Sequence, residues 1–259
     1  MRKEVAVLGW GDVGKAIGEI VAAAGNNLLV KDPAKSLSFG PPGILDVLHI
    51  CFPWSPDFNE TVIKEIKENL PDLTIIESTV PVGTTDLIAT ISGRRVVHSF
   101  VRGLHFELSK SLRTFQKYIG GEAESARQAI NYYSELGLRP YHLGSAETTE
   151  LAKLLSTAYF GWSLLFAKAA KHYADQFGVD YKDVYSHPGI TYNEGYLSLG
   201  HPEFVRPILR PPDGKIGGKC VSQNIDLMTS TTFQDVFKIL NDEGIFDDTI
   251  VIQKAIDGR

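Results

Sequence analysis

The chain has 259 residues, of which 43% are hydrophobic and 22% charged, so it is long enough for one large or two modest globular domains. Its formal net charge is -5, and the scattered lysines and arginines exclude the basic footprint of a nucleic-acid-binding protein. The N-terminal apolar run is too short for a signal peptide or membrane span, and two cysteines are too few for a disulfide framework. We therefore expect a cytoplasmic protein with no nucleic-acid, membrane or metal partner.

The first 145 residues alternate between short β-rich runs and amphipathic helical runs. Strands are predicted at 4–8, 27–30, 47–52, 73–77, 95–100, 117–119 and 140–143. Helices are predicted at 12–24, 58–70, 84–91 and 125–136. This alternation is typical of an α/β fold, here a Rossmann-type doubly wound parallel sheet with helices on both faces.

From residue 146 onward the pattern changes. Residues 146–178 have no strand signal and are predicted to form one long helix, which is apolar almost all round between 158 and 167 and is therefore expected to be buried on every side. The stretch from Pro188 to Pro212 is predicted to be an ordered loop, and the chain from Val221 onward to be helical. These features predict a second, all-helical domain over 146–259, built on a long central helix.

A Gly-rich turn follows the first strand and opens the first helix. It consists of Gly9, Trp10, Gly11, Asp12, Val13 and Gly14. In such a turn the first glycine permits the tight bend, the second lets a pyrophosphate approach the backbone, and the third lets the helix lie close to the sheet. The helix N-terminus then offers unpaired N–H groups to the phosphates. The turn predicts a dinucleotide-binding domain over 1–145.

Asp32 ends the second strand and is expected to accept hydrogen bonds from the ribose hydroxyls of the dinucleotide. A carboxylate at this position repels a 2′-phosphate and therefore favours NAD over NADP. Lys31 beside it would weaken that preference. We expect NAD as the cofactor.

Four segments, in chain order, resemble the UDP-glucose/GDP-mannose dehydrogenase family of nucleotide-sugar dehydrogenases, within the 6-phosphogluconate/3-hydroxyacid dehydrogenase-like superfamily. They are HICFPWSP at 49–56, ESTVPVGTT at 77–85, ELAK at 150–153 and GKIGGKC at 214–220. They are similar to the end of the family's third strand, its STVP-x-GTT segment, the start of its central helix and its G-x-G-G-x-C loop. By this resemblance, Pro53 contributes to the cofactor site.

The resemblance implies a mechanism, because this family oxidises a primary alcohol to a carboxylate in two NAD-dependent steps, through a cysteine thiohemiacetal and thioester. Cys220 would be the nucleophile, Lys153 would stabilise the oxyanion, and Thr79 would lie near the nicotinamide and the catalytic water. Gly217 and Gly218 would present backbone N–H groups to an oxyanion. A nearby ammonium group lowers the pKa of a thiol and so activates it.

The chain departs from the family pattern at several positions. Thr157 stands where the family has an asparagine, and Asn224 where it has an aspartate, so hydrogen bonding is kept but a proton acceptor is lost. The family's P-E-F-L-x-E segment is replaced by HSFVRGLHFE, in which Arg102 is a candidate anion contact. His105 in the same segment is a candidate titrating group, and an ordinary loop histidine is an equal interpretation.

The chain also ends soon after Cys220, which leaves too few residues for the family's C-terminal nucleotide-sugar-binding domain. The substrate is then smaller, another chain completes the site, or nucleotide-sugar binding has been lost. Arg102, Arg206 and Arg210 are candidate contacts for a polar or anionic, possibly sugar-derived, substrate. The apolar stretch 158–167 predicts a homodimer, since a small second domain covers it poorly.

Three functions fit these features. The first is an NAD-dependent oxidoreductase of a CH–OH group, with Cys220 and Lys153 at the reaction centre. The second is a single hydride transfer, as in the related β-hydroxyacid dehydrogenases, which share a lysine on the central helix and need no cysteine. The third is a dinucleotide-binding protein without turnover, which the altered family positions favour. Cys51, inside an apolar strand, is expected to be a core residue.

Overall fold

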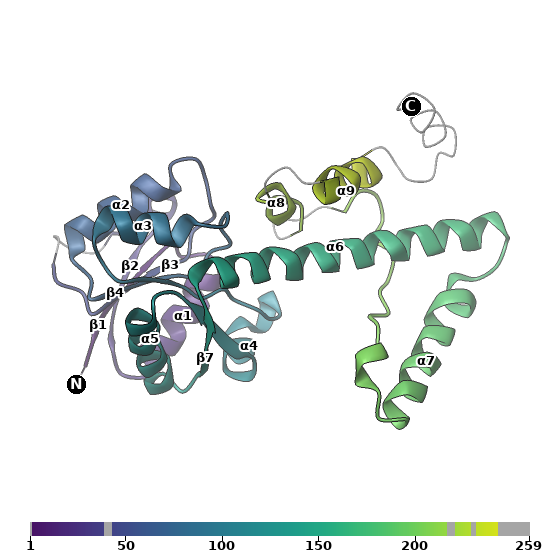
Figure 1. Cartoon of the computed structure of the whole chain (residues 1–259), viewed down its shortest axis with the longest axis horizontal. Coiled ribbons are helices and arrows are strands. Elements are labelled where there is room, and N and C mark those ends of the chain that lie inside the picture. The colour runs from purple at the N-terminus through teal and green to yellow at the C-terminus, as the bar shows by residue number, and fades with distance from the viewer. Residues whose placement is uncertain (1, 39–42, 217–220, 229–231, 243–259) are drawn as a thin grey trace. The chain divides into compact units, whose positions relative to one another are not determined.

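The computed structural model describes residues 2–38, 43–216, 221–228 and 232–242 (Figure 1). The chain forms two compact units, Met1–Lys153 and Leu154–Arg259. The division falls inside the long helix α6 (Ala146–Gln176), so about two turns of this helix belong to the first unit. In the described part of the chain, no helix is both long and apolar enough to cross a membrane.

The first unit is built on a seven-stranded sheet with the order β2-β1-β3-β4-β5-β6-β7. The strands are β1 (Glu4–Leu8), β2 (Asn27–Lys31), β3 (Val47–Ile50), β4 (Leu73–Ile76), β5 (Val96–His98), β6 (Gln116–Gly120) and β7 (Arg139–Gly144). Neighbouring strands run parallel except β5 and β6, which pair antiparallel through His98 and Gly120. The predicted Rossmann-type sheet is confirmed, with one reversal that the sequence did not indicate.

Helices cover both faces of this sheet. They are α1 (Asp12–Ala23), α2 (Phe58–Asn69), α3 (Thr84–Ser92), α4 (Leu108–Thr114) and α5 (Ala123–Glu135). Because successive strand residues point to opposite faces, Val5 and Val7 pack in one layer with residues of α1, α4 and α5. Ala6 and Leu8 pack in the other layer with residues of α2 and α3. The sheet is therefore doubly wound. Cys51 is buried in the first layer, as expected.

The second unit is helical in its described residues. Its elements are the greater part of α6, a π-helical turn η3 (Lys182–Ser186), α7 (His187–Ser198), η4 (Pro202–Phe204), α8 (Val221–Asp226) and α9 (Thr232–Asp242). Ala158 and Leu165 of α6 pack against Ile225 and Phe237 of the last two helices. A Cβ at Gly161 would lie 2.8 Å from a methyl group of Val221, so glycine permits this close helix contact. The predicted all-helical second domain on a long helix is thus confirmed.

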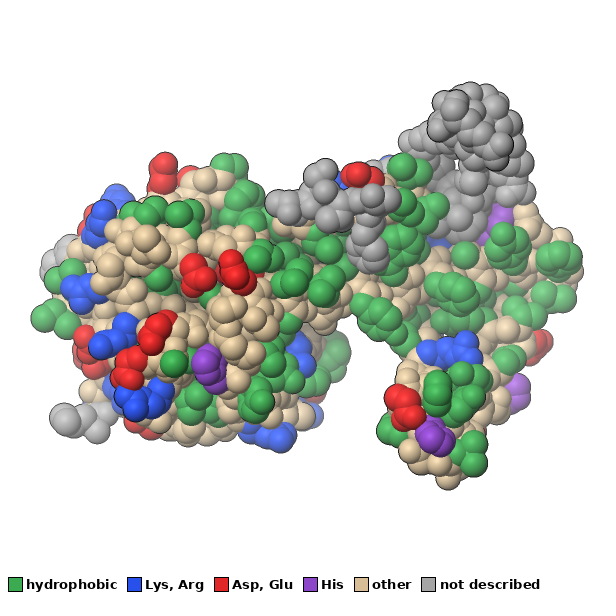
Figure 2. All heavy atoms as spheres, viewed as in Figure 1, with side chains coloured by type: hydrophobic (Ala, Val, Ile, Leu, Met, Phe, Trp, Pro, Cys, Tyr) green, Lys and Arg blue, Asp and Glu red, His purple; other side chains and the backbone are tan. Residues whose placement is uncertain are grey.

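Two expectations for this unit are wrong. The Pro- and Gly-rich stretch is not a loop throughout, because α7 occupies its first part, with Pro188 as its second residue. Helix α6 is not buried on every side in the single chain, since Tyr159, Phe160 and Phe166 are 62%, 46% and 63% exposed. Figure 2 shows such hydrophobic side chains at the surface of the α6 and α7 part of the chain.

Candidate functional site

The turn between β1 and α1 requires glycine at two of its three glycine positions. Gly9 has a φ of +95°, and a Cβ there would come within 2.7 Å of the backbone nitrogen of Phe52. A Cβ at Gly14 would lie 1.9 Å from the carbonyl oxygen of Gly9, so only glycine lets α1 begin this close to the sheet. A Cβ at Gly11 would meet no described atom within 4 Å. The backbone at Gly11 is therefore open on the side where a side chain would stand.

This turn lies at the point where the strand order of the sheet reverses, because β1 has β2 on one side and β3 on the other. In open α/β sheets, ligands bind outside the carboxyl ends of the strands at such a point. The close approach of Gly9 to Phe52 joins the two strand ends there. Pro53, the next residue, is exposed. The glycine turn thus stands where the fold itself favours ligand binding.

Asp32 directly follows β2, and its Oδ2 accepts a hydrogen bond from the backbone N–H of Trp10, at 2.8 Å. The carboxylate is thereby held beside the glycine turn. Lys31, which would weaken a preference for NAD, forms an ion pair with Glu65, at 2.5 Å between Nζ and Oε1. The Glu65 side chain is only 6% exposed, so the protein interior already balances the charge of this lysine.

His105, expected as a titrating group of the site, lies 3.4 Å from the carboxylate of Asp12, measured from Nδ1 to Oδ2. Asp12 is the first residue of α1. Both side chains are more than half exposed. The pair therefore lies beside the N-terminus of the helix that follows the glycine turn. Val13 is the second residue of the same helix and is partly buried.

Two of the family-like segments, far apart in the sequence, are bound to one another. The carboxylate of Glu150 in α6 accepts hydrogen bonds from the backbone N–H groups of Gly83 and Thr85, at 2.7 and 2.9 Å, and from the Thr85 hydroxyl, at 2.6 Å. Glu150 therefore caps the N-terminus of α3. Burial raises the pKa of Glu150, and the hydrogen bonds from Thr85 and Gly83 oppose the rise.

Lys153 follows Glu150 by one helical turn and is partly buried. Its Nζ donates a hydrogen bond to the carbonyl oxygen of Val101, at 3.0 Å. Val101 lies just beyond β5, and Thr79 lies just beyond β4. The lysine thus lies at the carboxyl edge of the parallel strands. This is the same edge of the sheet that carries the glycine turn and Asp32.

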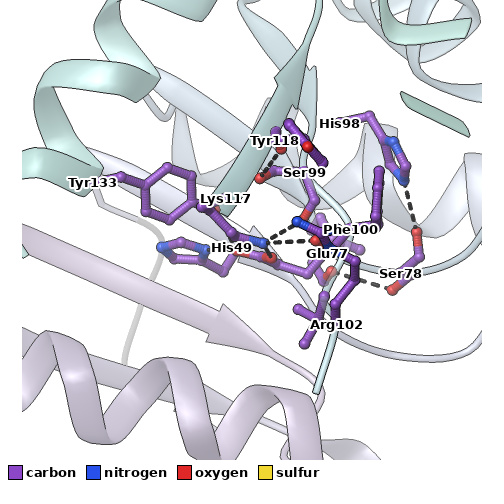
Figure 3. A network of polar contacts seen from close by, with 12 residues as sticks. His49, Glu77, Ser78, His98, Ser99, Phe100, Arg102, Lys117, Tyr118 and Tyr133 are labelled. Carbon is purple, nitrogen blue, oxygen red and sulfur yellow. Dashed lines mark hydrogen bonds and ion pairs between the residues drawn. The ribbon is translucent and has the colours of Figure 1, made fainter. Parts of the chain in front are cut away.

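A buried ionic network lies near the carboxyl edge of the sheet (Figure 3). No motif in the sequence predicts it. Lys117 Nζ lies 2.5 Å from Glu77 Oε2, and the two side chains are 2% and 0% exposed. Glu77 Oε1 accepts a hydrogen bond from the Tyr133 hydroxyl, at 2.5 Å, and lies 2.9 Å from His49 Nδ1. The sequence signal for such a network is the presence of a glutamate, a lysine and a histidine within predicted strands.

Charge balance explains why Glu77 stays ionised in the interior. Burial by itself raises the pKa of Glu77, but the charge of Lys117 and the hydrogen bond from His49 outweigh it and lower this pKa to about 2. Burial lowers the pKa of Lys117, and the Glu77 carboxylate opposes that fall. The two groups stabilise each other as an ion pair, which is what a buried charge requires.

His98 joins three elements near the same edge. Its Nδ1 lies 2.9 Å from the Thr149 hydroxyl of α6, and its Nε2 lies 3.2 Å from the carbonyl oxygen of Ser78, beyond β4. Burial lowers the pKa of His98 to about 3, so the ring is neutral at physiological pH. The imidazole therefore acts as an uncharged polar link between β4, β5 and α6.

Arg102, expected to contact an anion, is engaged within the first unit. Its guanidinium group donates to the carbonyl oxygen of Gln116, at 2.7 Å, and lies 4.5 Å from the centre of the Tyr118 ring. The side chain is partly buried against aromatic rings. These contacts fix the guanidinium group in place, and its role as an anion contact stays a prediction.

The second unit brings two of the altered family positions together. The Asn224 amide donates a hydrogen bond to the Thr157 hydroxyl, at 3.2 Å, and Asn224 is buried. Arg206 stacks on the Tyr192 ring at 3.6 Å and lines a cavity of about 420 Å³; both Arg206 and Arg210 are exposed. The candidates in the glycine–cysteine loop lie outside the described residues. They are Gly217, Gly218 and Cys220.

Comparisons with known proteins agree with the family-like segments. No protein-family profile matches the chain. In sequence it is similar to UDP-N-acetyl-D-mannosamine dehydrogenase from Methanocaldococcus jannaschii, with 30% identity over 165 residues, covering 62% of this chain and 35% of that enzyme. The enzyme of the same name from Pyrococcus horikoshii is 28% identical over 174 residues, covering 63% and 38%. The chain thus spans little more than a third of the length of these curated relatives.

Solved structures match a larger share of the chain. UDP-D-ManNAc dehydrogenase from Pyrococcus horikoshii superposes with a TM-score of 0.73 at 21% identity, covering 100% of this chain and 72% of that one. The 3-hydroxyisobutyrate dehydrogenase of Mycobacterium tuberculosis superposes with a TM-score of 0.71 at 17% identity, covering 95% of both chains. The chain therefore has the fold of the matched parts of these dehydrogenases. In its N-terminal part it is UDP-sugar dehydrogenase-like in sequence, as the motifs predicted.

Proposed function

We propose that this chain is an NAD-dependent oxidoreductase that acts on the CH–OH group of a polar or anionic substrate. One observation carries the proposal: a glycine turn with its carboxylate, and a helix-borne lysine, lie at the same edge of one sheet. The two parts come from opposite ends of the first unit. Oxidation of an alcohol needs both parts: the glycine turn and its carboxylate would bind the hydride acceptor, and the lysine would stabilise the negative charge on the alcohol oxygen.

The residues at this edge fit a dinucleotide. The open space at Gly11 and the unpaired N–H groups of α1 suit a pyrophosphate. Asp32 suits ribose hydroxyls and repels a 2′-phosphate, while the engagement of Lys31 by Glu65 leaves that repulsion in force. The nicotinamide, when bound, supplies the hydride acceptor.

Lys153 is proposed to stabilise the developing negative charge on the substrate oxygen. An ammonium group that donates to a carbonyl in the resting site can redirect one of its three N–H donors to an alkoxide. Glu150, anchored on α3, holds the helix turn that carries the lysine. The chain thereby orients the cation before the substrate arrives.

The number of hydride transfers separates two forms of this proposal. In the lead form, Cys220 carries a thiohemiacetal and a thioester, and the product is an acid. In the second form, the chain transfers one hydride and needs no cysteine. Asn224, whose amide donates to the Thr157 hydroxyl, cannot take up the proton that thioester hydrolysis releases, so the lead form needs another proton acceptor.

Counting NADH against alcohol consumed tests both forms. The chain is supplied with NAD and a panel of polar and anionic alcohols; two NADH per alcohol support the thioester route and one supports simple oxidation. Cys220→Ser should abolish acid formation in the first case and leave the rate unchanged in the second. Alkylation of Cys220 is expected to have the same effect as Cys220→Ser. Cys51 does not react in its place, because it is buried and burial raises its pKa well above the usual value. NAD binding without NADH from any alcohol would leave only a dinucleotide-binding role.

We also propose that the second unit forms a homodimer contact. The exposed aromatic side chains of α6, among them Tyr159, Phe160 and Phe166, form an apolar surface of the kind that a second copy covers. Sedimentation at micromolar concentration is expected to give a dimer. A monomer under those conditions would contradict this part of the proposal.

A further inference from the structure

One buried ammonium group connects the two chain segments that lead to the proposed reaction centre (Figure 3). Besides Glu77, Lys117 Nζ donates to the carbonyl oxygens of Ser99 and Phe100, at 2.5 and 3.2 Å. Phe100 directly precedes Val101, whose carbonyl oxygen receives Lys153. Lys117 therefore holds the backbone next to the partner of the proposed catalytic lysine.

The other end of the pair lies just before Thr79. Glu77 directly follows β4 and precedes Thr79 by two residues, and its carboxylate is held from three sides, by Lys117, Tyr133 and His49. A carboxylate with three partners cannot rotate freely, so the backbone that carries it is held as well. The pair thus ties the end of β4 to the end of β5.

The reversal of β6 explains how a lysine reaches this position. Since β6 runs antiparallel to β5, its first residues lie at the carboxyl edge of β5 rather than at the opposite edge. Lys117 is the second residue of β6, and its side chain is buried there. The carbonyls of Ser99 and Phe100 lie beyond the β5 ladder and need donors, which the ammonium group supplies.

We propose that Lys117 and Glu77 are positioning residues that set the place of Lys153 relative to the reacting alcohol. This inference rests on the proposed function, and neither residue touches the substrate. A pair that served stability alone could be replaced by apolar side chains of similar volume without loss, as is often found for buried ion pairs. A positioning pair cannot be replaced in this way, because apolar residues would leave the carbonyl oxygens of Ser99 and Phe100 without the N–H donors of Lys117.

The double variant Glu77→Gln/Lys117→Met tests this distinction, because it removes both charges together and keeps the volume of the pair. On the alcohol that the wild-type chain oxidises, kcat is expected to fall about tenfold or more, while the Kd for NAD stays within about twofold. Lys153 is also expected to become several-fold more reactive in reductive methylation, followed by peptide mass spectrometry, because its partner carbonyl is displaced. Thermal unfolding establishes that the variant is folded.

Lys3→Met is the matched control, since it breaks a more exposed ion pair with Glu135 and should leave kcat and Lys153 methylation unchanged. A folded double variant with wild-type kcat and wild-type Lys153 methylation would overturn the inference. If the wild-type chain oxidises no alcohol, the proposed function fails, and the methylation rates still decide whether the pair positions Lys153. If the double variant does not fold, Glu77→Gln is measured in the same way; unchanged methylation there would overturn the inference, and faster methylation would support it.

Discussion

The two units of the chain differ in how they cover their surfaces. In the first unit, helices cover both faces of the sheet, and even the charged Glu77 and Lys117 are buried with partners. In the second unit, one face of α6 packs against α8 and α9, while Tyr159 and Phe166 of the same helix stay exposed. The first unit also exposes single apolar side chains, such as Phe106, but its helices pack on the sheet, whereas in the described second unit α6 leaves several aromatic rings uncovered.

This difference bears on the parts that the two units play in the proposed function. The groups proposed to bind NAD and to stabilise an alkoxide all lie in the first unit, where fixed partners set their positions. Such rigidity suits catalysis, which depends on groups that are oriented before the reaction. The second unit contributes apolar and aromatic surface, which suits recognition of another chain or of a substrate.

The largest effect is expected for Lys153→Met, which tests whether this lysine of the first unit belongs to the reaction centre. Lys153→Met removes the ammonium group but none of the proposed NAD contacts, so kcat should fall about 10²–10⁴-fold with little change in the Kd for NAD. NADH formation and calorimetry measure the two quantities. Lys171→Met, which breaks only an exposed pair with Asp175 in the second unit, is the control. A near-normal rate in the Lys153 variant would place the chemistry elsewhere.

A pair of glycine substitutions separates the structural from the binding role of the turn. Gly14→Ala should lower the free energy of unfolding by about 1–3 kcal/mol, because its Cβ would meet the Gly9 carbonyl oxygen at 1.9 Å. Gly11→Ala should lower the free energy of unfolding by less than about 1 kcal/mol, since no described atom is near its Cβ. It should nevertheless weaken NAD binding as strongly as Gly14→Ala does, because the added methyl group stands where the pyrophosphate approaches the backbone. Urea unfolding and calorimetry are the measurements. Normal NAD binding in Gly11→Ala would show that the pyrophosphate does not bind at this turn.

Acid should destabilise the first unit through His98. The folded protein keeps this ring neutral down to about pH 3, whereas the unfolded chain takes up a proton near pH 6.5, so stability present above pH 6.5 is lost as the pH falls. The slope is at most about 1.4 kcal/mol per pH unit. His98→Gln cannot titrate and should show a flatter profile between about pH 6.5 and 4.5 in urea unfolding. Identical slopes would show that the ring is not held neutral.

The smallest effect on the single chain is expected in the second unit. Phe166→Ala should change the free energy of unfolding of the monomer by less than about 0.5 kcal/mol, because the ring is exposed, but should shift a dimer toward monomer. Phe58→Ala, in the buried core of the first unit, should instead cost about 3–5 kcal/mol without changing assembly. Sedimentation and denaturant unfolding at several concentrations compare the two. A large loss of monomer stability in Phe166→Ala would erase the contrast between the units.

Much of the first unit follows from local sequence patterns. The alternation of strand and helix signals predicts its strands and most of its α-helices closely. Among the described α-helices of this unit it does not indicate α4, since seven residues carry too little periodicity. In the second unit, the Pro- and Gly-rich composition predicts a loop where α7 stands, and Pro188 is the second residue of that helix. The glycine turn and Asp32 could be predicted because a tight turn, a close approach and a strand end depend on neighbouring residues.

The chain's own sequence therefore determined its fold class, its glycine turn and the lysine on its central helix. Only the tertiary structure decided that Glu150 caps α3, that Lys117 meets Glu77, and that one side of α6 stays uncovered. The partners in the first two cases lie 65 to 67 and 40 positions apart in the sequence. Such contacts depend on the order and direction of strands in the sheet. No local pattern encodes the reversal of β6 that brings Lys117 to the carboxyl edge, where it holds the backbone beside Lys153.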